Sequence, residues 1–204
     1  MPATGAGRST TPAPSLADAL ETSEIIHDRV TVDAAIDAMG ARIAADYMRV
    51  GATGADTRPL FLTVMHGGLP FAARLALALG ERGLDLAFDY LHATRYRGAT
   101  SGGELTWKHR PATPLAGRRV LLVDDIVDEG HTLAQVRAWC LAEGAADVRI
   151  AAMVVKRHDR CVEGLVADYA GLDVPDRYVF GYGMDYHEQG RNLPAIHALR
   201  KDAQ

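Results

Sequence analysis

The sequence has few cysteines and no excess of positive charge, and each shortage excludes a class of protein. Its 204 residues include two cysteines, Cys140 and Cys161, which form neither a CxxC pair nor a metal-ligand spacing. We therefore expect no disulfide framework, which fits a protein of the reducing cytoplasm. The formal net charge is −4, so no basic domain for nucleic acid is indicated and no nucleic-acid partner is expected.

Long apolar runs are missing as well. No stretch approaches the roughly 20 apolar residues of a membrane-spanning helix, and no secretory signal is evident, so no membrane partner is expected. The sequence contains 48% hydrophobic and 24% charged residues, and this composition suits one globular domain. Residues 1–15 are rich in Ala, Thr, Pro, Gly and Ser and are predicted to be a disordered tail before a single domain at 16–204.

Apolar runs and helical periodicities alternate along this domain. Apolar runs predict buried strands at residues 60–65, 86–93, 120–123, 149–155 and 178–182. Helical periodicity predicts helices at residues 34–50, 70–79 and 132–142, the first capped by Thr31 or Asp33. Residues 97–114 carry only a weak strand signal and fit a flexible hairpin or lid. The alternation predicts an α/β fold, with a mostly parallel central sheet flanked by helices.

The segment from Val120 to Thr132 carries the strongest functional signal. Its strand is followed by Asp124 and Asp125, and then by a loop that leads into the helix at 132–142. Backbone N–H groups at a helix N-terminus favour an anion, and Gly130 lets the backbone approach it closely. The residues predicted to cradle this anion are Glu129, Gly130, His131 and Thr132.

The two acids point to a second part of the same ligand. Carboxylates do not bind a phosphate directly, so Asp124 and Asp125 are expected to face ribose hydroxyls or a metal ion. A phosphate and a diol at this separation indicate a ribose 5-phosphate. In the simpler alternative the acids only end a strand and Asp128 caps a helix. The combination of strand, acids, glycine and threonine disfavours that alternative.

This segment resembles the loop that binds phosphoribosyl pyrophosphate (PRPP) in type I phosphoribosyltransferases. It matches neither the P-loop nor GxGxxG. The resemblance runs from about Thr31 to the C-terminus, and residues 154–157, 167–171 and 175–186 are similar to the hypoxanthine-guanine branch. It implies a small hood built from terminal segments, about 16–35 and 156–204. It also implies a homodimer or homotetramer.

The resemblance assigns the C-terminal residues to the base and to a metal ion. Lys156 would donate to purine O6, since an ammonium has donors only. Tyr178 would stack on the base, and Val179 would contact it through its backbone. Asp185 would hold Mg²⁺, supported by Asp124 and Asp125. Without the resemblance, Lys156 also fits a solvated strand end, Tyr178 a core aromatic and Asp185 a turn.

Two further segments resemble family motifs but depart from them. The pyrophosphate-binding turn corresponds to His66, Gly67 and Gly68, with Arg191 as an added cation that also fits a solvated surface charge. Members often carry lysine in place of His66, and frequently have a cis peptide here, which we predict between Met65 and His66. The lid pair of the family, Ser-Tyr, corresponds to Arg95 and Tyr96.

The implied activity is the Mg²⁺-dependent conversion of hypoxanthine or guanine and PRPP into IMP or GMP and pyrophosphate. Asp128 is the candidate catalytic residue, a general base or proton partner near purine N7. Adenine and pyrimidine acceptors are disfavoured by Lys156 and residues 178–185. Two alternatives stay open: a xanthine-preferring phosphoribosyltransferase, and a nucleotide-sensing, RNA-binding regulator of the same fold. The sequence does not rank hypoxanthine against guanine.

Overall fold

A central sheet and a smaller sheet organise the protein. The computed structural model describes residues 15–49, 57–95 and 105–201. The central sheet has the strand order β4-β3-β2-β5-β6-β7. Its strands are β2 (Leu60–Val64), β3 (Ala87–Arg95), β4 (Leu105–His109), β5 (Arg119–Val127), β6 (Asp147–Lys156) and β7 (Tyr169–Val174). All neighbours pair in parallel except β4, which lies antiparallel at the edge beside β3. The predicted α/β class is confirmed.

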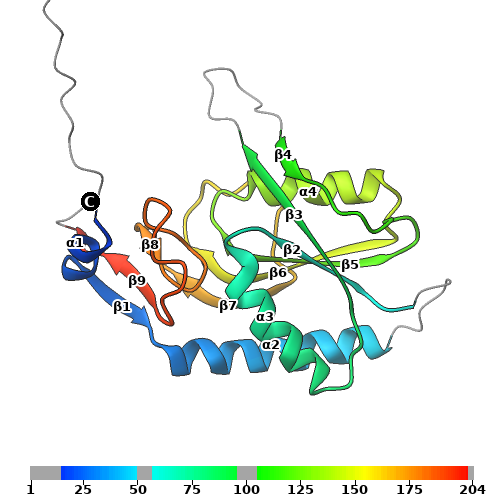
Figure 1. Ribbon diagram of the computed structural model, residues 1–204, viewed down its shortest axis with the longest axis horizontal. Coiled ribbons are helices and arrows are strands. Elements are labelled where there is room, and N and C mark those ends of the chain that lie inside the picture. Colours follow the sequence, from blue (N-terminus) through cyan, green and yellow to red (C-terminus); the bar gives the residue numbers. More distant parts are fainter. Residues whose placement is uncertain (1–14, 50–56, 96–104, 202–204) are drawn as a thin grey trace, which may run out of the picture.

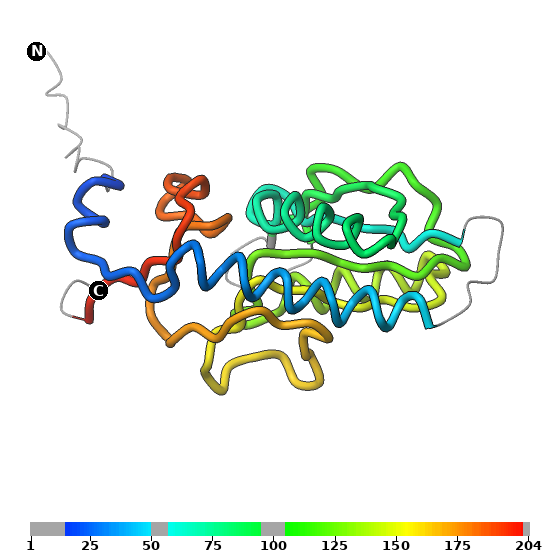
Figure 2. The backbone as a smooth tube through the Cα atoms, turned by 90° about the horizontal axis from the view of Figure 1, so that it is seen from below, coloured from blue at the N-terminus to red at the C-terminus, as the bar shows by residue number. Residues whose placement is uncertain are grey.

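Helices cover both faces of this sheet. Helices α2 (Arg29–Arg49) and α3 (Gly68–Gly80) lie on one face and α4 (His131–Ala142) lies on the other (Figure 1). Seen from below, α2 runs along its face of the sheet (Figure 2). Alternate residues of β5 therefore enter two cores. Leu121 and Val123 pack with α2 and α3, whereas Val120 and Leu122 pack with α4. A strand buried on both faces reads as a continuous apolar run, which is why it was predictable.

The smaller sheet joins segments from the two ends of the chain. It has the order β1-β9-β8, with β1 (Ser23–His27) and β8 (Val179–Phe180) each antiparallel to β9 (Ile196–Leu199). Helix α1 (Leu16–Glu21) precedes it, and the Ser15 side chain accepts a hydrogen bond from the Ala17 N–H as its N-cap. Ser15 thus belongs to the folded part. The rest of the predicted tail, residues 1–14, lies outside the described residues.

Several predicted boundaries differ from the structure, including those of one helix and two strands. Helix α2 begins at Arg29 rather than residue 34, because Asp28 accepts a hydrogen bond from the Thr31 N–H at 2.8 Å. Strand β5 does not end at Val123 but continues through both acids to Val127, which pairs with Val155 of β6. The last predicted strand, 178–182, shrinks to Val179–Phe180, since positive φ angles at Gly181 and Tyr182 turn the chain away. No helix in the described part of the chain has the length and apolar character needed to cross a membrane.

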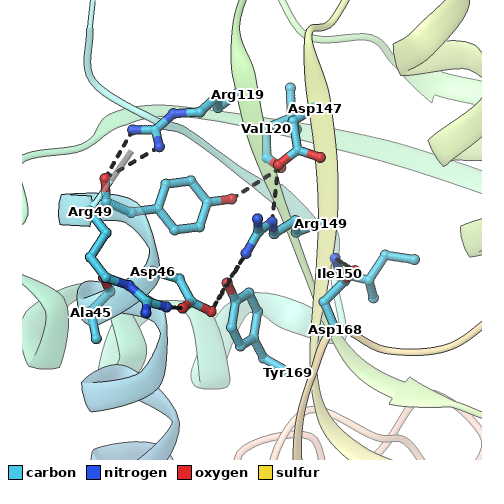
Figure 3. A network of polar contacts seen from close by, with 11 residues as sticks. Ala45, Asp46, Arg49, Arg119, Val120, Asp147, Arg149, Ile150, Asp168 and Tyr169 are labelled. Carbon is cyan, nitrogen blue, oxygen red and sulfur yellow. Dashed lines mark hydrogen bonds and ion pairs between the residues drawn. The ribbon is translucent and has the colours of Figure 1, made fainter. Parts of the chain in front are cut away.

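A charged network ties α2 to the N-terminal ends of the central strands (Figure 3). The Arg149 guanidinium lies 3.0 Å from an Asp147 carboxylate oxygen and donates to the Tyr169 hydroxyl at 2.8 Å. That hydroxyl donates in turn to Asp46 of α2 at 3.1 Å. Tyr169 is buried, so its hydroxyl links β6, β7 and α2 where little water competes.

Removing this hydroxyl is expected to cost stability without affecting any activity. Tyr169→Phe loses two hydrogen bonds to charged partners, so the free energy of unfolding should fall by about 1–3 kcal/mol and the Tm by several degrees. Calorimetry measures both. Tyr90→Phe is the control, because Tyr90 is exposed and stacks its ring on His109. Equal Tm values for the two variants would show that the network contributes nothing.

Candidate active site

Four loops meet at the carboxyl edge of the central sheet, where ligands bind in open α/β folds. The turn after β2 contains His66 to Gly68, and the β5–α4 loop contains Asp128 to Gly130. Lys156 ends β6, and the fourth loop, residues 181–191, follows β8 of the smaller sheet. The structure therefore brings together segments separated by more than a hundred residues in sequence.

The loop before α4 has the form expected of an anion cradle. Helix α4 begins at His131, and its Ala134 N–H donates to the Gly130 carbonyl. The N–H groups of the residues before Ala134 thus precede the first intrahelical bond and are placed to meet an anion. Gly130 has a φ of 78°, and a Cβ there would collide with Leu165. Both observations require glycine. Glu129 and His131 flank it, with His131 Nε2 3.7 Å from Glu129 Oε2.

Asp124 and Asp125 lie inside β5, beside the turn that follows β2. Asp125 is buried, and its carboxylate fills the space that a Cβ on Gly67 would need. A Cβ on Gly183 would likewise meet the Gly67 carbonyl oxygen. Burial raises the pKa of both carboxyls, and the Asp125 charge raises that of Asp124 further, while Arg191 opposes the rise. A cation near this pair would therefore favour its charged form.

The turn after β2 has the predicted cis peptide between Met65 and His66. Gly68 opens α3, where a Cβ would lie 2.9 Å from the Val123 carbonyl oxygen. His66 is exposed, and its ring meets the ring of His92 edge-on, with centroids 4.4 Å apart. Burial, followed by the nearby His66, lowers the pKa of His92. Sequence reasoning missed His92, because one histidine within a strand forms no motif.

Arg191 and Asp185 close the 181–191 loop on itself. Arg191 Nη2 lies 2.6 Å from an Asp185 carboxylate oxygen, and its Nη1 donates to the Gly183 carbonyl at 2.8 Å. The Glu188 N–H donates to the other Asp185 oxygen. Arg191 is therefore not the solvated surface charge of the alternative interpretation. It is held toward Gly183, which itself packs on Gly67 and Asp125.

Asp128 is the centre of a second group of charges. Lys156 Nζ lies 2.6 Å from its Oδ2, and His158 Nε2 lies 2.6 Å from its Oδ1. Burial opposes the charge of Asp128, yet the hydrogen bonds from Lys156 and His158 outweigh it and lower its pKa. The Lys156 side chain is only 12% exposed, so it is not a solvated strand-end lysine. Sequence reasoning missed His158, which has no counterpart in the motifs used.

The remaining predicted residues lie nearby or outside the described chain. Tyr178 is 39% exposed, so it is not a core aromatic, and its ring contacts those of Tyr186 and His187. Val179 is buried and pairs with Ala198. The Arg95 backbone pairs with Leu105, whereas Tyr96 and residues 97–104 of the predicted hairpin or lid lie outside the described residues. The described part of that segment includes β4.

The described residues contain no group of three or more His, Cys, Asp or Glu side chains that could together hold a metal ion. Besides Asp128, the acids at the carboxyl edge are Asp185, which Arg191 holds, and Asp124 with its buried neighbour Asp125. Such a sparse set of oxygen donors suits Mg²⁺, which takes one or two carboxylates and completes its shell with substrate phosphates and water. The residues present therefore fit a magnesium ion that arrives with its substrate.

Comparison with known proteins defines the class of this fold and site. A family model described as the phosphoribosyl transferase domain matches residues 30–187, and the chain belongs to this family. Among curated relatives, the chain is 34% identical to the hypoxanthine-guanine phosphoribosyltransferase of Streptococcus pneumoniae, over 87% of this chain and 92% of the relative. It is 33% identical to the enzyme of that name from Bacillus subtilis, over 79% and 84%.

Solved structures agree with these relatives. The hypoxanthine phosphoribosyltransferase of Trypanosoma cruzi, solved as a mutant in a ternary substrates complex, superimposes with a TM-score of 0.81 at 30% identity, over 90% of this chain and 98% of the other. A glutamic acid mutant from a study of an invariant aspartic acid in such enzymes gives 0.82 at 28%, over 89% and 98%. The predicted resemblance to the hypoxanthine-guanine branch is thereby confirmed.

The packing of Gly67 on Asp125 gives a testable consequence. Gly67→Ala puts a methyl group where the Asp125 carboxylate lies, so the turn or the acid must move. We expect kcat/KM for PRPP to fall about tenfold or more, because small displacements at a reacting centre are costly. Gly80→Ala is the matched control, since a Cβ there has no neighbour within 4 Å. Equal kinetics for both variants would refute the importance of this contact.

Proposed function

We propose that this protein transfers the 5-phosphoribosyl group of PRPP to hypoxanthine or guanine, forming IMP or GMP and pyrophosphate. The observation that carries the proposal is the position of Asp128. It follows Asp124 and the buried Asp125 and precedes the anion cradle of α4. Its Oδ2 lies 2.6 Å from Nζ of Lys156, the residue expected to recognise a 6-oxo group. Sugar phosphate and base would thus meet at one carboxylate.

The phosphoribosyl part of PRPP suits the loop from Glu129 to Thr132. In this proposal the 5′-phosphate accepts hydrogen bonds from the N–H groups at the start of α4, where the helix dipole also favours an anion. Asp124 and Asp125 orient the ribose hydroxyls, which can donate to carboxylates. The 5′-phosphate and the acids then fix the sugar from two sides.

The base would lie between Lys156 and the aromatic residues that follow β7. Lys156 donates to purine O6, Tyr178 stacks on the ring, and the Val179 backbone contacts the ring edge. An ammonium has no acceptor, so the 6-amino group of adenine finds no partner there. The exposure of Tyr178, at 39%, supports a ring that is available for stacking.

The chemistry requires one bond to break and one to form. Purine N9 attacks C1 of PRPP, the C1–O bond breaks, and its electron pair leaves with pyrophosphate. The proton on N7 passes to Asp128. Hydrogen bonds from Lys156 and His158 outweigh burial and lower the pKa of this carboxyl, which favours the charged form that a proton acceptor needs. The N–H groups of the turn at His66, Gly67 and Gly68, together with Arg191, would stabilise the leaving pyrophosphate.

Magnesium fits the same arrangement. Asp185 would hold the ion, with Asp124 and Asp125 supporting it. When bound, Mg²⁺ supplies positive charge that offsets the charge of the leaving pyrophosphate. Closure of a lid that includes Arg95 and Tyr96, and assembly as a homodimer or homotetramer, remain predictions.

Release of pyrophosphate from PRPP tests the proposal. With Mg²⁺ present, we expect release to require hypoxanthine or guanine, and to stop when EDTA removes the metal. Separate reactions with xanthine, adenine and no base test the alternatives. Fastest turnover with xanthine would favour the xanthine-preferring enzyme, and no release with any base would remove the enzymatic function.

A further inference from the structure

His158 contacts Asp128 directly but has no role in the proposed mechanism. Its Nε2 lies 2.6 Å from Asp128 Oδ1, while Lys156 occupies the other oxygen, Oδ2. The His158 side chain is only 3% exposed, whereas that of Asp128 is 42% exposed, so the imidazole end of this hydrogen bond is shielded from water. A buried, short contact with a carboxylate strongly restrains that carboxylate.

Both nitrogens of the His158 ring have partners, and these partners determine its tautomer. The Arg160 N–H donates to His158 Nδ1 at 3.1 Å, so Nδ1 must carry a lone pair. The proton of a neutral ring then resides on Nε2, which donates to Asp128. A second proton on Nδ1 would leave the Arg160 N–H without this acceptor. The geometry therefore favours a neutral ring fixed at both ends.

Lys156 alone cannot hold Asp128 in a constant orientation through the reaction. Its ammonium ends a flexible four-carbon stem, and the proposed function assigns it to purine O6 as well. His158 has a rigid ring and no contact with the substrate in that scheme. We infer that His158 is a positioning residue, which orients Asp128 toward the purine N7 proton while Lys156 binds the base. This inference rests on the proposed function.

The charged residues around His158 lie with it at the carboxyl edge of the central sheet. Asp128, Lys156, Arg160 and Asp176 face it, and Arg160 holds Asp176 through two hydrogen bonds of 2.9 and 2.6 Å. The Arg160–Asp176 pair is exposed, with side chains 50% and 44% accessible, and includes the residue whose backbone N–H sets the tautomer. Loss of the Nε2 donor would remove one of the two hydrogen bonds that favour the charged form of Asp128.

Two substitutions separate hydrogen bonding from packing. His158→Phe keeps a flat ring without a donor, whereas His158→Gln keeps an N–H at a similar reach. We expect His158→Phe to lower kcat for hypoxanthine about tenfold with the KM for PRPP unchanged, and to move the acidic limb of the kcat–pH profile upward. His158→Gln should stay within about threefold of the original protein. His27→Phe, at a histidine of β1 whose Nε2 lies 2.8 Å from the Asp173 carbonyl oxygen, is the control and should change neither.

A double-mutant cycle tests whether His158 acts through Asp128. In the Asp128→Asn background, His158→Phe should change kcat by less than about twofold. Imidazole ¹⁵N NMR of the original protein should show the Nε2–H tautomer of His158, with the Nε2 signal moving in Asp128→Asn.

Three results would overturn the inference while leaving the proposed function intact: normal kcat in His158→Phe, an equal loss in His158→Gln, or a full tenfold loss in the Asp128→Asn background. Absence of turnover by the original protein with every base would instead overturn the proposed function, and this inference with it.

Discussion

Asp128→Asn is expected to lower kcat for hypoxanthine by about 10²–10⁴-fold while the Kd for PRPP stays within about threefold. Asparagine matches the shape of aspartate but accepts no proton under these conditions. The proposed PRPP ligands, in contrast, are Asp124, Asp125 and the N–H groups at the start of α4, which this substitution leaves in place. Steady-state kinetics give kcat, and titration calorimetry gives the Kd.

Asp168→Asn provides the control for this result. Asp168 accepts a hydrogen bond from the Ile150 N–H at 2.8 Å, and the asparagine carbonyl can replace that acceptor (Figure 3). Its kinetics should match those of the original protein. If Asp128→Asn also turned over normally, Asp128 would have no part in proton transfer, and its lowered pKa would report only its hydrogen bonds with Lys156 and His158.

Lys156→Gln is expected to remove the discrimination between oxo- and aminopurines. A hydrogen bond from a charged donor contributes about 1.5–3 kcal/mol, so kcat/KM for hypoxanthine should fall about 10–100-fold. The glutamine amide has both a donor and an acceptor, so it tolerates a 6-amino group that the ammonium rejects. The ratio of kcat/KM for hypoxanthine to that for adenine should therefore fall as well.

The neighbouring residue is the control for that experiment. Arg157 is 66% exposed and forms a surface ion pair with Asp173, which contributes little. Arg157→Gln should leave the base preference unchanged. An unaltered hypoxanthine-to-adenine ratio in Lys156→Gln would show that another group selects the base.

Local patterns in the sequence predicted the parts of the molecule that depend on neighbours in the chain. The run Val120 to Val123 identified a strand buried on both faces, and Gly130 identified the turn into α4. The same apolar pattern led to the wrong end for β5, at Val123 instead of Val127. Asp124 and Asp125 look like strand terminators, but the ladder to β6 continues past them because Ile126 and Val127 still pair there.

Contacts between segments that are distant in the sequence could not be predicted from local patterns. Strand β1 is short and pairs with β9, about 170 residues away in the chain, which pairs with β8 on its other side. The collision between Gly67 and Asp125 and the hydrogen bond from His158 to Asp128 likewise exist only after folding. One histidine in a polar loop carries no periodicity, so nothing in the sequence distinguishes it from a solvated side chain.

Competition between bases for a limiting amount of PRPP tests the central claim most directly. The original protein is given Mg²⁺, PRPP and equal concentrations of hypoxanthine, guanine, xanthine and adenine, and the nucleotide products are separated and quantified. We predict that IMP and GMP together account for nearly all product and that AMP is negligible. Predominance of AMP or XMP, or the absence of any nucleotide, would contradict the assignment of a 6-oxopurine phosphoribosyltransferase acting on hypoxanthine or guanine.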